Sequence, residues 1–225
     1  MRLTVATHDA VKFACLKFHY AKAVPSVAIA FNVYNDREEW CGCIVYGYGS
    51  NNHIGCEYNL VQGEVFELVR VALNGKQEQT SKAVAMSLKE LKKRYPLLKL
   101  IVSYADCDQS HLGTIYQATN WVYVGSVYVN QNDGGFIIKG KKVHGRTIDS
   151  QIKRMGGLKE GQTRLDFVHK YHDKNAIPHI TKGKRKYLFP LTKAMKKKCE
   201  ALRKPYPKEA GWTKIDRTSF KKEKK

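Results

Sequence analysis

The order of apolar and polar positions is most informative near the centre of the chain. Residues 98–102 form a short apolar, β-branched run, which predicts a buried strand. A polar cluster typical of a turn before a helix follows where that strand should end: Asp106, Asp108, Gln109 and Ser110. Residues 111–120 then predict a short helix, and residues 121–129 another strand. Because ligands in open α/β sheets bind just past the carboxyl ends of strands, we expect a site that starts at Asp106.

The pattern on the N-terminal side predicts a sheet with helices packed against it. Helical spacing marks residues 8–18, and a second amphipathic stripe marks residues 80–95 before Pro96. Strand patterns mark residues 27–34 and 40–48, joined by the charged turn NDREE, and residues 64–73.

The last part of the chain has weaker periodicity. Residues 136–145 predict a final hairpin that closes the sheet, and residues 188–204 predict a short basic helix. We therefore expect an α/β protein (an α+β mixed sheet) with a catalytic domain at residues 1–145. Residues 146–225 would form a basic, partly irregular extension packed on that domain, with a disordered end.

Two features in the middle of the chain suggest a bound anion. Phe66, Leu68 and Arg70 alternate along one predicted strand, so Arg70 should share an apolar sheet face and require a carboxylate or phosphate partner. Thr80 or Ser81 is a suitable N-cap for the next helix, whose backbone N–H groups could cradle a phosphate. Any helix N-terminus offers such groups, and the sequence has no GxGxxG or Walker pattern there.

His19 and Tyr20 follow the first predicted helix and allow two interpretations. They could end an amphipathic helix, with Tyr20 packed and His19 in solvent. Alternatively, they could place an imidazole and a phenol at the edge of a substrate cleft, where both are suited to acid–base chemistry.

The formal net charge of +20 is concentrated toward the C-terminus. Residues 1–138 hold 13 Lys and Arg against 12 Asp and Glu, whereas residues 139–225 hold 27 against 8. This distribution is typical of a protein that binds a polyanion, and a solubilising tail is the alternative. Aromatic residues among the lysines favour nucleic acid, with expected contacts from a flexible-loop tyrosine and from the basic part: Tyr48, Lys182, Lys184, Arg185, Lys186 and Lys204.

Other features narrow the class of protein. No run of about 18 apolar residues is present, and the N-terminus lacks a secretory signal pattern, so we expect a cytoplasmic protein without a membrane partner. Cys41 and Cys43 lack a second pair at zinc spacing and are interpreted as buried thiols. His169, His172 and His179 are interpreted as solvated or phosphate-contacting residues rather than metal ligands. The oligomeric state stays open, with a dimer as one option.

Several motifs in one order add a resemblance to known proteins. A capped helix after a long strand, followed by strand, turn, helix and strand, resembles the GNAT-type acyltransferase superfamily. Within it, the following motifs together resemble the Mom family of phage DNA-modification proteins over most of residues 17–208: HYAKAVP, ELVRVAL, TSKAVAMSLKELKKRYP, SYADCDQSHLGTIYQATNWVYVG, KRKYLFPL and KPYPK. The glycine-rich pyrophosphate loop of the superfamily is reduced here to NGKQEQTSKA.

The resemblance implies an enzyme that converts adenine in double-stranded DNA to an N6-carbamoylmethyl form, which blocks host restriction nucleases. It implies catalytic positions at His19, Tyr20, Asp106 and Tyr116. The donor, of acyl-coenzyme A type or another activated kind, would be held by a further set: Arg70, Thr80, Ser81, Ser103 and Asn120.

The reaction suggests a role for each group. N6 of adenine is a poor nucleophile, so the reaction needs an activated donor and a base; Asp106 suits the base, and Tyr116 could protonate a leaving group. His19 and Asp106 could alternatively ligate iron or another divalent metal. The target base should flip out of the duplex, with Tyr20, Tyr46 or Tyr48 as a stacking surface.

Two alternatives stay open from the sequence. One is a GNAT-type N-acetyltransferase that acts on an amine of a protein or small molecule. The other is a basic DNA-binding protein without catalysis, in which Tyr116 is a core residue and Asp106 only a helix cap.

Overall fold

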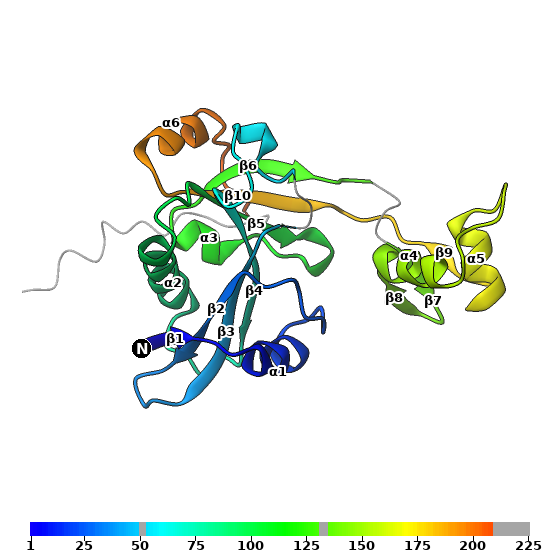
Figure 1. Cartoon of the computed structure of the whole chain (residues 1–225), viewed down its shortest axis with the longest axis horizontal. Coiled ribbons are helices and arrows are strands. Elements are labelled where there is room, and N and C mark those ends of the chain that lie inside the picture. Colours follow the sequence, from blue (N-terminus) through cyan, green and yellow to red (C-terminus); the bar gives the residue numbers. More distant parts are fainter. Residues whose placement is uncertain (50–52, 131–134, 209–225) are drawn as a thin grey trace, which may run out of the picture.

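A computed structural model describes residues 1–49, 53–130 and 135–208 of the chain. Its centre is a seven-stranded mixed sheet in the order β1-β2-β3-β4-β5-β10-β6 (Figure 1). The predicted class, an α/β protein with a mixed sheet, is confirmed. The strands of this sheet are, in chain order, β1 (Arg2–Val5), β2 (Ile29–Tyr34), β3 (Trp40–Gly47), β4 (Val65–Leu73), β5 (Leu100–Asp106), β6 (Val122–Val127) and β10 (Lys184–Pro190).

The parallel pair β4 and β5 opens part-way along its length. The two strands are paired only from Val65 opposite Leu100 to Glu67 opposite Val102, and they separate beyond that point. Helix α2 (Thr80–Arg94) follows β4, and the short helix α3 (Thr114–Ala118) follows β5. This order of strand, helix, strand, helix and strand is the one that the GNAT-type resemblance implies.

Helices cover both faces of the sheet. One core cluster packs under α2 and α3 and includes Phe66, Leu68 and Trp121. On the opposite face, α1 (His8–Phe18) packs Val11 and Cys15 against β3 and β4, and α6 (Lys193–Ala201) contributes Met195 and Cys199 to a neighbouring cluster. The separated ends of β4 and β5 therefore lie between two packed layers.

A β-bulge in β4 reverses the side-chain alternation that the sequence predicts. Val45 is opposite Arg70 while the next residue, Tyr46, is opposite Leu68, so Val69 is an extra residue. Leu68 and Tyr46 lie in the cluster under α2, whereas Val45 packs with α1. Because paired residues share a face, Arg70 lies on the α1 face; the prediction that Arg70 shares a face with Leu68 was wrong.

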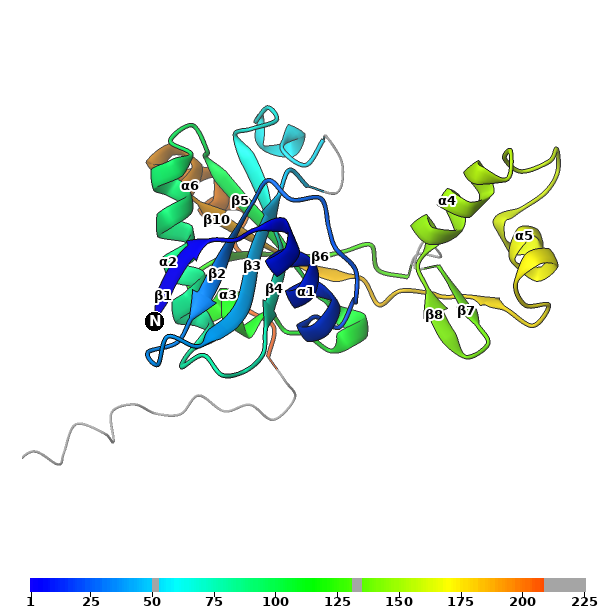
Figure 2. The same cartoon turned by 60° about the horizontal axis from the view of Figure 1, so that its bottom comes forward.

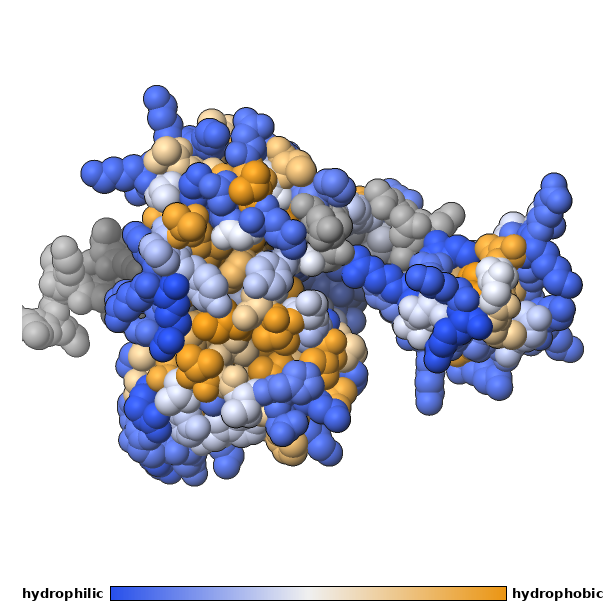
Figure 3. Space-filling view, viewed as in Figure 1, coloured by the Kyte–Doolittle hydropathy of each residue, from blue (hydrophilic) through white to orange (hydrophobic). Residues whose placement is uncertain are grey.

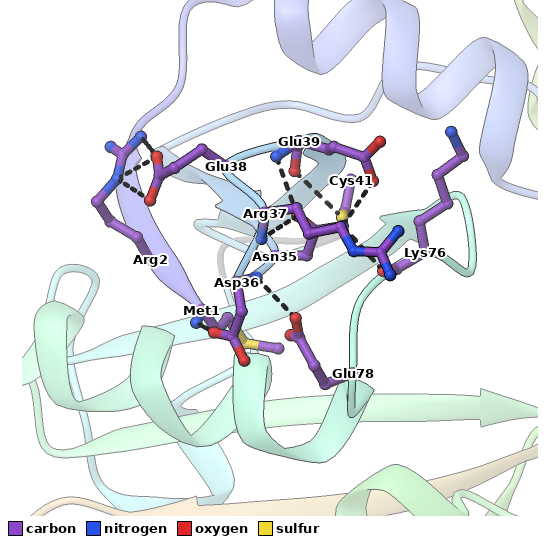
Figure 4. Close-up of polar contacts among 10 residues, drawn as sticks. All are labelled: Met1, Arg2, Asn35, Asp36, Arg37, Glu38, Glu39, Cys41, Lys76 and Glu78. Carbon is purple, nitrogen blue, oxygen red and sulfur yellow. Dashed lines mark hydrogen bonds and ion pairs between the residues drawn. The ribbon is translucent and has the colours of Figure 1, made fainter.

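The turn between β2 and β3 is held by a polar network (Figure 4). The Asn35 side-chain oxygen accepts hydrogen bonds from the backbone N–H groups of Arg37 and Glu39, at 3.0 and 2.9 Å. Arg2 pairs with Glu38 across the sheet edge, so β1 is tied to the same turn. The charged turn predicted from NDREE is confirmed as a hairpin connection.

Residues 136–180 form a small lobe inserted between β6 and β10, and we call it the inserted lobe. It contains β7 (Phe136–Ile138), β8 (Lys141–Val143), α4 (Gly145–Arg154), α5 (Arg164–Tyr171) and β9 (Ile177–Pro178). Its strands form a separate sheet in the order β8-β7-β9, around a core of its own that includes Phe136, Ile148, Ile152 and Phe167. Figures 1 and 2 both show this lobe standing away from the seven-stranded sheet.

The lobe changes three predictions about the C-terminal part. The hairpin at 136–145 does not close the main sheet. Residues 188–190, predicted to start a basic helix, belong instead to β10, which lies between β5 and the edge strand β6, and the helix runs from Lys193 to Ala201. Because β10 pairs with β5 and β6, the main sheet extends beyond the predicted boundary at residue 145. None of the helices in the described ranges combines the length and apolar character needed to cross a membrane.

Gly113 is required at the start of α3. Its φ is +76°, and a Cβ there would lie 2.5 Å from the ring of Tyr187. We expect Gly113→Ala to lower the free energy of unfolding by about 2–4 kcal/mol, from left-handed backbone strain and overpacking. Chemical denaturation measures this loss.

Gly140→Ala is the matched control, since its φ of +74° is nearly the same and nothing lies within 4 Å of the added Cβ. It should cost only the backbone strain, about 1–2 kcal/mol. Equal losses in the two variants would contradict the packing argument.

Candidate active site at the split between two strands

A cleft of about 560 Å³ lies where β4 and β5 separate. Its walls include the end of α1, the bulged part of β4, the end of β5 and the start of α3. Six of the residues predicted from the sequence line it, and the structure thus brings them together from distant parts of the chain: His19, Tyr20, Arg70, Asp106, Tyr116 and Lys184.

Asp106 is the last residue of β5 and caps the short 3-10 helix η2 (Cys107–Gln109). Its Oδ1 accepts a hydrogen bond of 2.9 Å from the backbone N–H of Asp108. Its Oδ2 lies 3.4 Å from the Tyr20 hydroxyl, which donates to it. One oxygen is therefore fixed by the backbone, and the other faces the cleft, where a carboxylate can accept a proton.

Tyr116 lies on the side of the cleft formed by α3. Its hydroxyl is 2.8 Å from Ser103 Oγ, which in turn is 2.8 Å from the carbonyl oxygen of Leu68. Ser103 has one proton for these two contacts; when it donates to the Tyr116 oxygen, the phenol proton is free for another acceptor. Burial raises the pKa of Tyr116 to about 12, so the phenol stays protonated at neutral pH and can act as an acid.

His19 and Tyr20 form the wall opposite Tyr116. Burial, followed by the positive charge of Arg70, lowers the pKa of His19 to about 4, so its imidazole is neutral at pH 7. The His19 Nδ1 accepts a hydrogen bond from the backbone N–H of Ala21. Burial and then the Asp106 carboxylate raise the pKa of Tyr20, whose ring meets His111 edge-on at 5.4 Å. The cleft interpretation of these two residues agrees with this geometry.

The low pKa of His19 predicts a pH dependence of stability. Unfolded histidine titrates near about 6.5, so between that pH and about 4 the unfolded chain binds more protons than the folded chain. Stability should fall as the pH decreases through this window, and His19→Gln should lose part of that fall. Denaturant unfolding of both proteins at pH 7.5 and 5 measures it; an identical pH dependence would contradict the burial of neutral His19.

Arg70 and Glu67 add charge to the cleft from β4. Arg70 donates from Nη1 to the carbonyl oxygen of Val69 at 2.7 Å, and its buried Nε has no hydrogen-bond partner within the described residues. Glu67 lies at the point where the strands separate. Burial raises the pKa values of Tyr104 and Tyr116, and the negative charge of Glu67 raises both further. An unsatisfied guanidinium N–H suits an anionic or carbonyl ligand.

A second cavity of about 530 Å³ lies between α2, α3 and the end of β10. Ser81 and Asn120, both predicted to hold a donor, line it together with Lys82, Lys89 and Lys92. Thr80 starts α2 but accepts a hydrogen bond from Gln77, and the N-cap is Gln79 without a side-chain bond, so neither predicted N-cap was correct. Ser103 lies behind Tyr116 and lines neither cavity.

The predicted DNA contacts differ in their accessibility. Tyr48, Lys182, Lys184 and Lys204 are exposed, and Arg185 is partly exposed with its guanidinium donating to the carbonyl oxygen of His111. Lys186 is buried and pairs with Glu57, so the prediction that it contacts DNA was wrong.

Two further predictions concern stacking and metal binding. Tyr46 is fully buried and bonded to Ser87, which removes it as a stacking surface for a base. Among the residues that the structure describes, no three His, Cys, Asp or Glu side chains form a group able to hold a metal ion, and His19 with Asp106 provides two ligands only.

Comparison with known proteins decides the family. A model of the Mom protein family matches residues 2–208. The chain belongs to the Mom protein family. A protein of Escherichia phage Mu named methylcarbamoylase mom is 28% identical over 199 residues, which cover 84% of this chain and 76% of that protein. The resemblance predicted from the motifs is thereby confirmed, and membership agrees with the prediction of a transferase-type enzyme.

Solved structures of acetyltransferases are similar at low identity. A Bacillus subtilis acetyltransferase in complex with CoA has a TM-score of 0.45 and 10% identity, covering 85% of this chain and 99% of that chain. A spermidine N-acetyltransferase mutant from Vibrio cholerae has a TM-score of 0.47 and 10% identity, covering 88% and 99%. With TM-scores below 0.5, neither likeness supports a conclusion about this member of the Mom family.

The sequence pattern missed two acidic residues that matter for the geometry of this Mom-family cleft. Glu67 was read only as one position in an alternating strand, and Asp108 only as part of a polar turn. The sequence signal for Glu67 is a charged residue inside an otherwise apolar strand, because a glutamate is rarely buried in a sheet unless it is paired. For Asp108 no local signal existed, because its partners lie more than 30 residues away.

Proposed function

We propose that the protein modifies adenine in double-stranded DNA, attaching a carbamoylmethyl group to N6 from an activated donor. The observation that carries this proposal is the cleft itself, which is lined by both Asp106 and Tyr116, with Ser103 hydrogen-bonded to Tyr116 behind it. Membership of the Mom family and the name of the phage Mu relative supply the substrate class.

Asp106 and Tyr116 have separate chemical tasks in this proposal. The bond between N6 and the donor carbon forms while the bond from that carbon to its leaving group breaks. Asp106 accepts the proton from N6, and Tyr116 donates its proton to the leaving group, while Ser103 supports the phenol. The carboxylate also orients the N6–H bond, so that the nitrogen lone pair points at the donor.

The donor and the DNA reach the cleft from opposite sides of the sheet. A donor that carries phosphates suits the second cavity, because Lys82, Lys89 and Lys92 there can neutralise them. Its leaving group must be on the methylene carbon of the carbamoylmethyl group, since attack on an acyl thioester carbonyl would give an amide instead. DNA approaches the α1 side, where exposed Tyr20 offers a stacking surface for a flipped base. Lys184, at the start of β10, lines the cleft and can contact a phosphate there.

Restriction digestion tests the proposed function. Plasmid DNA from cells that make the protein should resist enzymes whose recognition sites contain adenine. The same DNA should be cut normally by enzymes whose sites contain only G and C. Cleavage of both kinds of site, with the protein soluble in those cells, would contradict DNA modification and leave an amine acetyltransferase or a DNA-binding protein without catalysis.

A further inference from the structure

Asp108 receives four hydrogen bonds from the part of the chain that enters and leaves the inserted lobe. Its carboxylate accepts from Lys142 Nζ at 2.5 Å, His179 Nε2 at 2.8 Å, Thr181 Oγ1 at 3.3 Å and the Lys182 backbone N–H at 2.8 Å. The side chain is only 9% exposed. We call this set of residues, Asp108 with Lys142, His179, Thr181 and Lys182, the joint.

The joint is the main polar connection between the lobe and the body. The lobe has a core of its own, and it stands away from the main sheet in both views (Figures 1 and 2). Burial alone would raise the pKa of Asp108, but hydrogen bonds from His179, Lys142 and the Lys182 backbone outweigh it and hold the pKa well below its usual range. A charged carboxylate with four donors makes strong, directional bonds.

The same residue also fixes the carboxylate in the cleft. The backbone N–H of Asp108 donates to Asp106 Oδ1, two residues earlier in the chain. A movement of η2 would therefore displace both the joint and the proposed base. The joint and the cleft share one short backbone segment.

Positive charge continues from the cleft across the joint onto the lobe. Lys184 lines the cleft and is the β10 residue opposite Asp106. Partial burial lowers the pKa of His144, and the charges of Arg146, Lys184 and Lys142 lower it further against the opposing charge of Asp149, so these three positive groups lie near His144. Residues 136–180 hold ten Lys and Arg against four Asp and Glu, and hydrophilic residues cover most of the lobe face seen in Figure 3.

We propose that Asp108 is a positioning residue that holds the inserted lobe beside the cleft, so that cleft and lobe bind one continuous DNA duplex. This inference rests on the proposed DNA substrate. The lobe contributes phosphate contacts beyond the target base, and the joint sets their distance from Asp106. A lobe freed from the joint would still carry its charge but would no longer hold the duplex in register with the cleft.

Asp108→Ala in the full chain tests the proposal, with Asp108→Asn as a variant of the same shape. Circular dichroism and thermal unfolding first establish that the main sheet stays folded. Small-angle X-ray scattering should then give a larger radius of gyration, and hydrogen exchange should rise at residues 181–183. Affinity for a duplex of about 30 base pairs should fall about tenfold, while affinity for one of about 8 base pairs should stay within about twofold.

Asp149→Ala is the matched control, because it also removes one acidic charge but makes none of the hydrogen bonds of the joint; Asp149 lies on α4 and pairs with Arg164. It should leave both the scattering and the length dependence of binding unchanged. Unchanged scattering and long-duplex affinity in folded Asp108→Ala would overturn the proposal. Scattering and binding do not depend on chemistry, so a protein without modification activity would refute the proposed function but not the joint.

Discussion

Replacing Asp106 by Asn should lower the rate of adenine modification at least about a hundredfold while leaving duplex affinity within about twofold. The reason is that the two carboxylate oxygens have different roles: Oδ1 caps η2, and Oδ2 faces the cleft. An amide oxygen can still accept the hydrogen bond from the Asp108 backbone, so the cap of η2 is kept. The amide has no negative charge to accept the N6 proton, so only the chemistry is lost. Single-turnover kinetics on an adenine-containing duplex measures the rate.

Asp9→Asn is the control for this substitution, because Asp9 is exposed on the first turn of α1 and lies outside the cleft. It should modify DNA at the rate of the unaltered protein. Full activity of Asp106→Asn would leave Asp106 with a capping role alone. If circular dichroism showed that this variant does not fold, the claim that Asn keeps the capping role and loses only the base would be contradicted.

Replacing Lys182 and Lys184 together by Gln should weaken the salt dependence of DNA binding. The slope of log Kd against the logarithm of the salt concentration should decrease by about two, which corresponds to about two counterions. Both side chains are exposed, Lys182 at the joint and Lys184 at the start of β10 beside the cleft. Each lysine that contacts a phosphate releases about one counterion, so affinity at moderate salt should fall steeply. Fluorescence anisotropy titrations at several salt concentrations measure the slope.

Lys186→Gln provides the contrast within the same strand. Its ammonium group is buried against Glu57 and Tyr58, and burial lowers its pKa to about 8. We expect this variant to lose stability without any change in the salt slope, because the residue does not reach DNA. If the slope decreased for Lys186→Gln as much as for the double variant, the claim that only the exposed lysines contact DNA would be contradicted.

Deletion of the C-terminal part is not a suitable test of DNA binding. Removing residues from 181 onward would take β10 out of the main sheet, where it pairs with both β5 and β6. Tyr187 and Leu188 on this strand are fully buried. Such a variant would lose its fold, and loss of binding would say nothing about charge.

The sequence pattern predicted the strands and helices that position the cleft, and most of its residues. The local pattern of apolar and polar residues was sufficient to predict β5, α2 and the polar turn at Asp106. The order of the motifs related distant segments of the chain, because the family resemblance placed His19 and Tyr116 in one predicted site. The structure places both on the walls of one cleft.

The remaining features depend on contacts between distant residues, which no local pattern contains. The strand alternation misplaced Arg70 because one extra residue, Val69, reverses the faces of β4. The sequence of β10 contains lysines and aromatic residues and resembles a basic segment, but pairing with β5 and β6 buries Lys186, Tyr187 and Leu188. Asp108 gained its importance only from partners 34 to 74 residues away.

Nucleoside analysis of DNA tests the central claim most directly. Plasmid DNA from cells that make the unaltered protein, or Asp106→Asn at the same soluble level, would be digested to nucleosides and analysed by mass spectrometry. We predict a nucleoside with the mass of deoxyadenosine plus a carbamoylmethyl group with the unaltered protein and none with Asp106→Asn. An unmodified deoxyadenosine pool in both samples, or a modification on another base, would contradict the account.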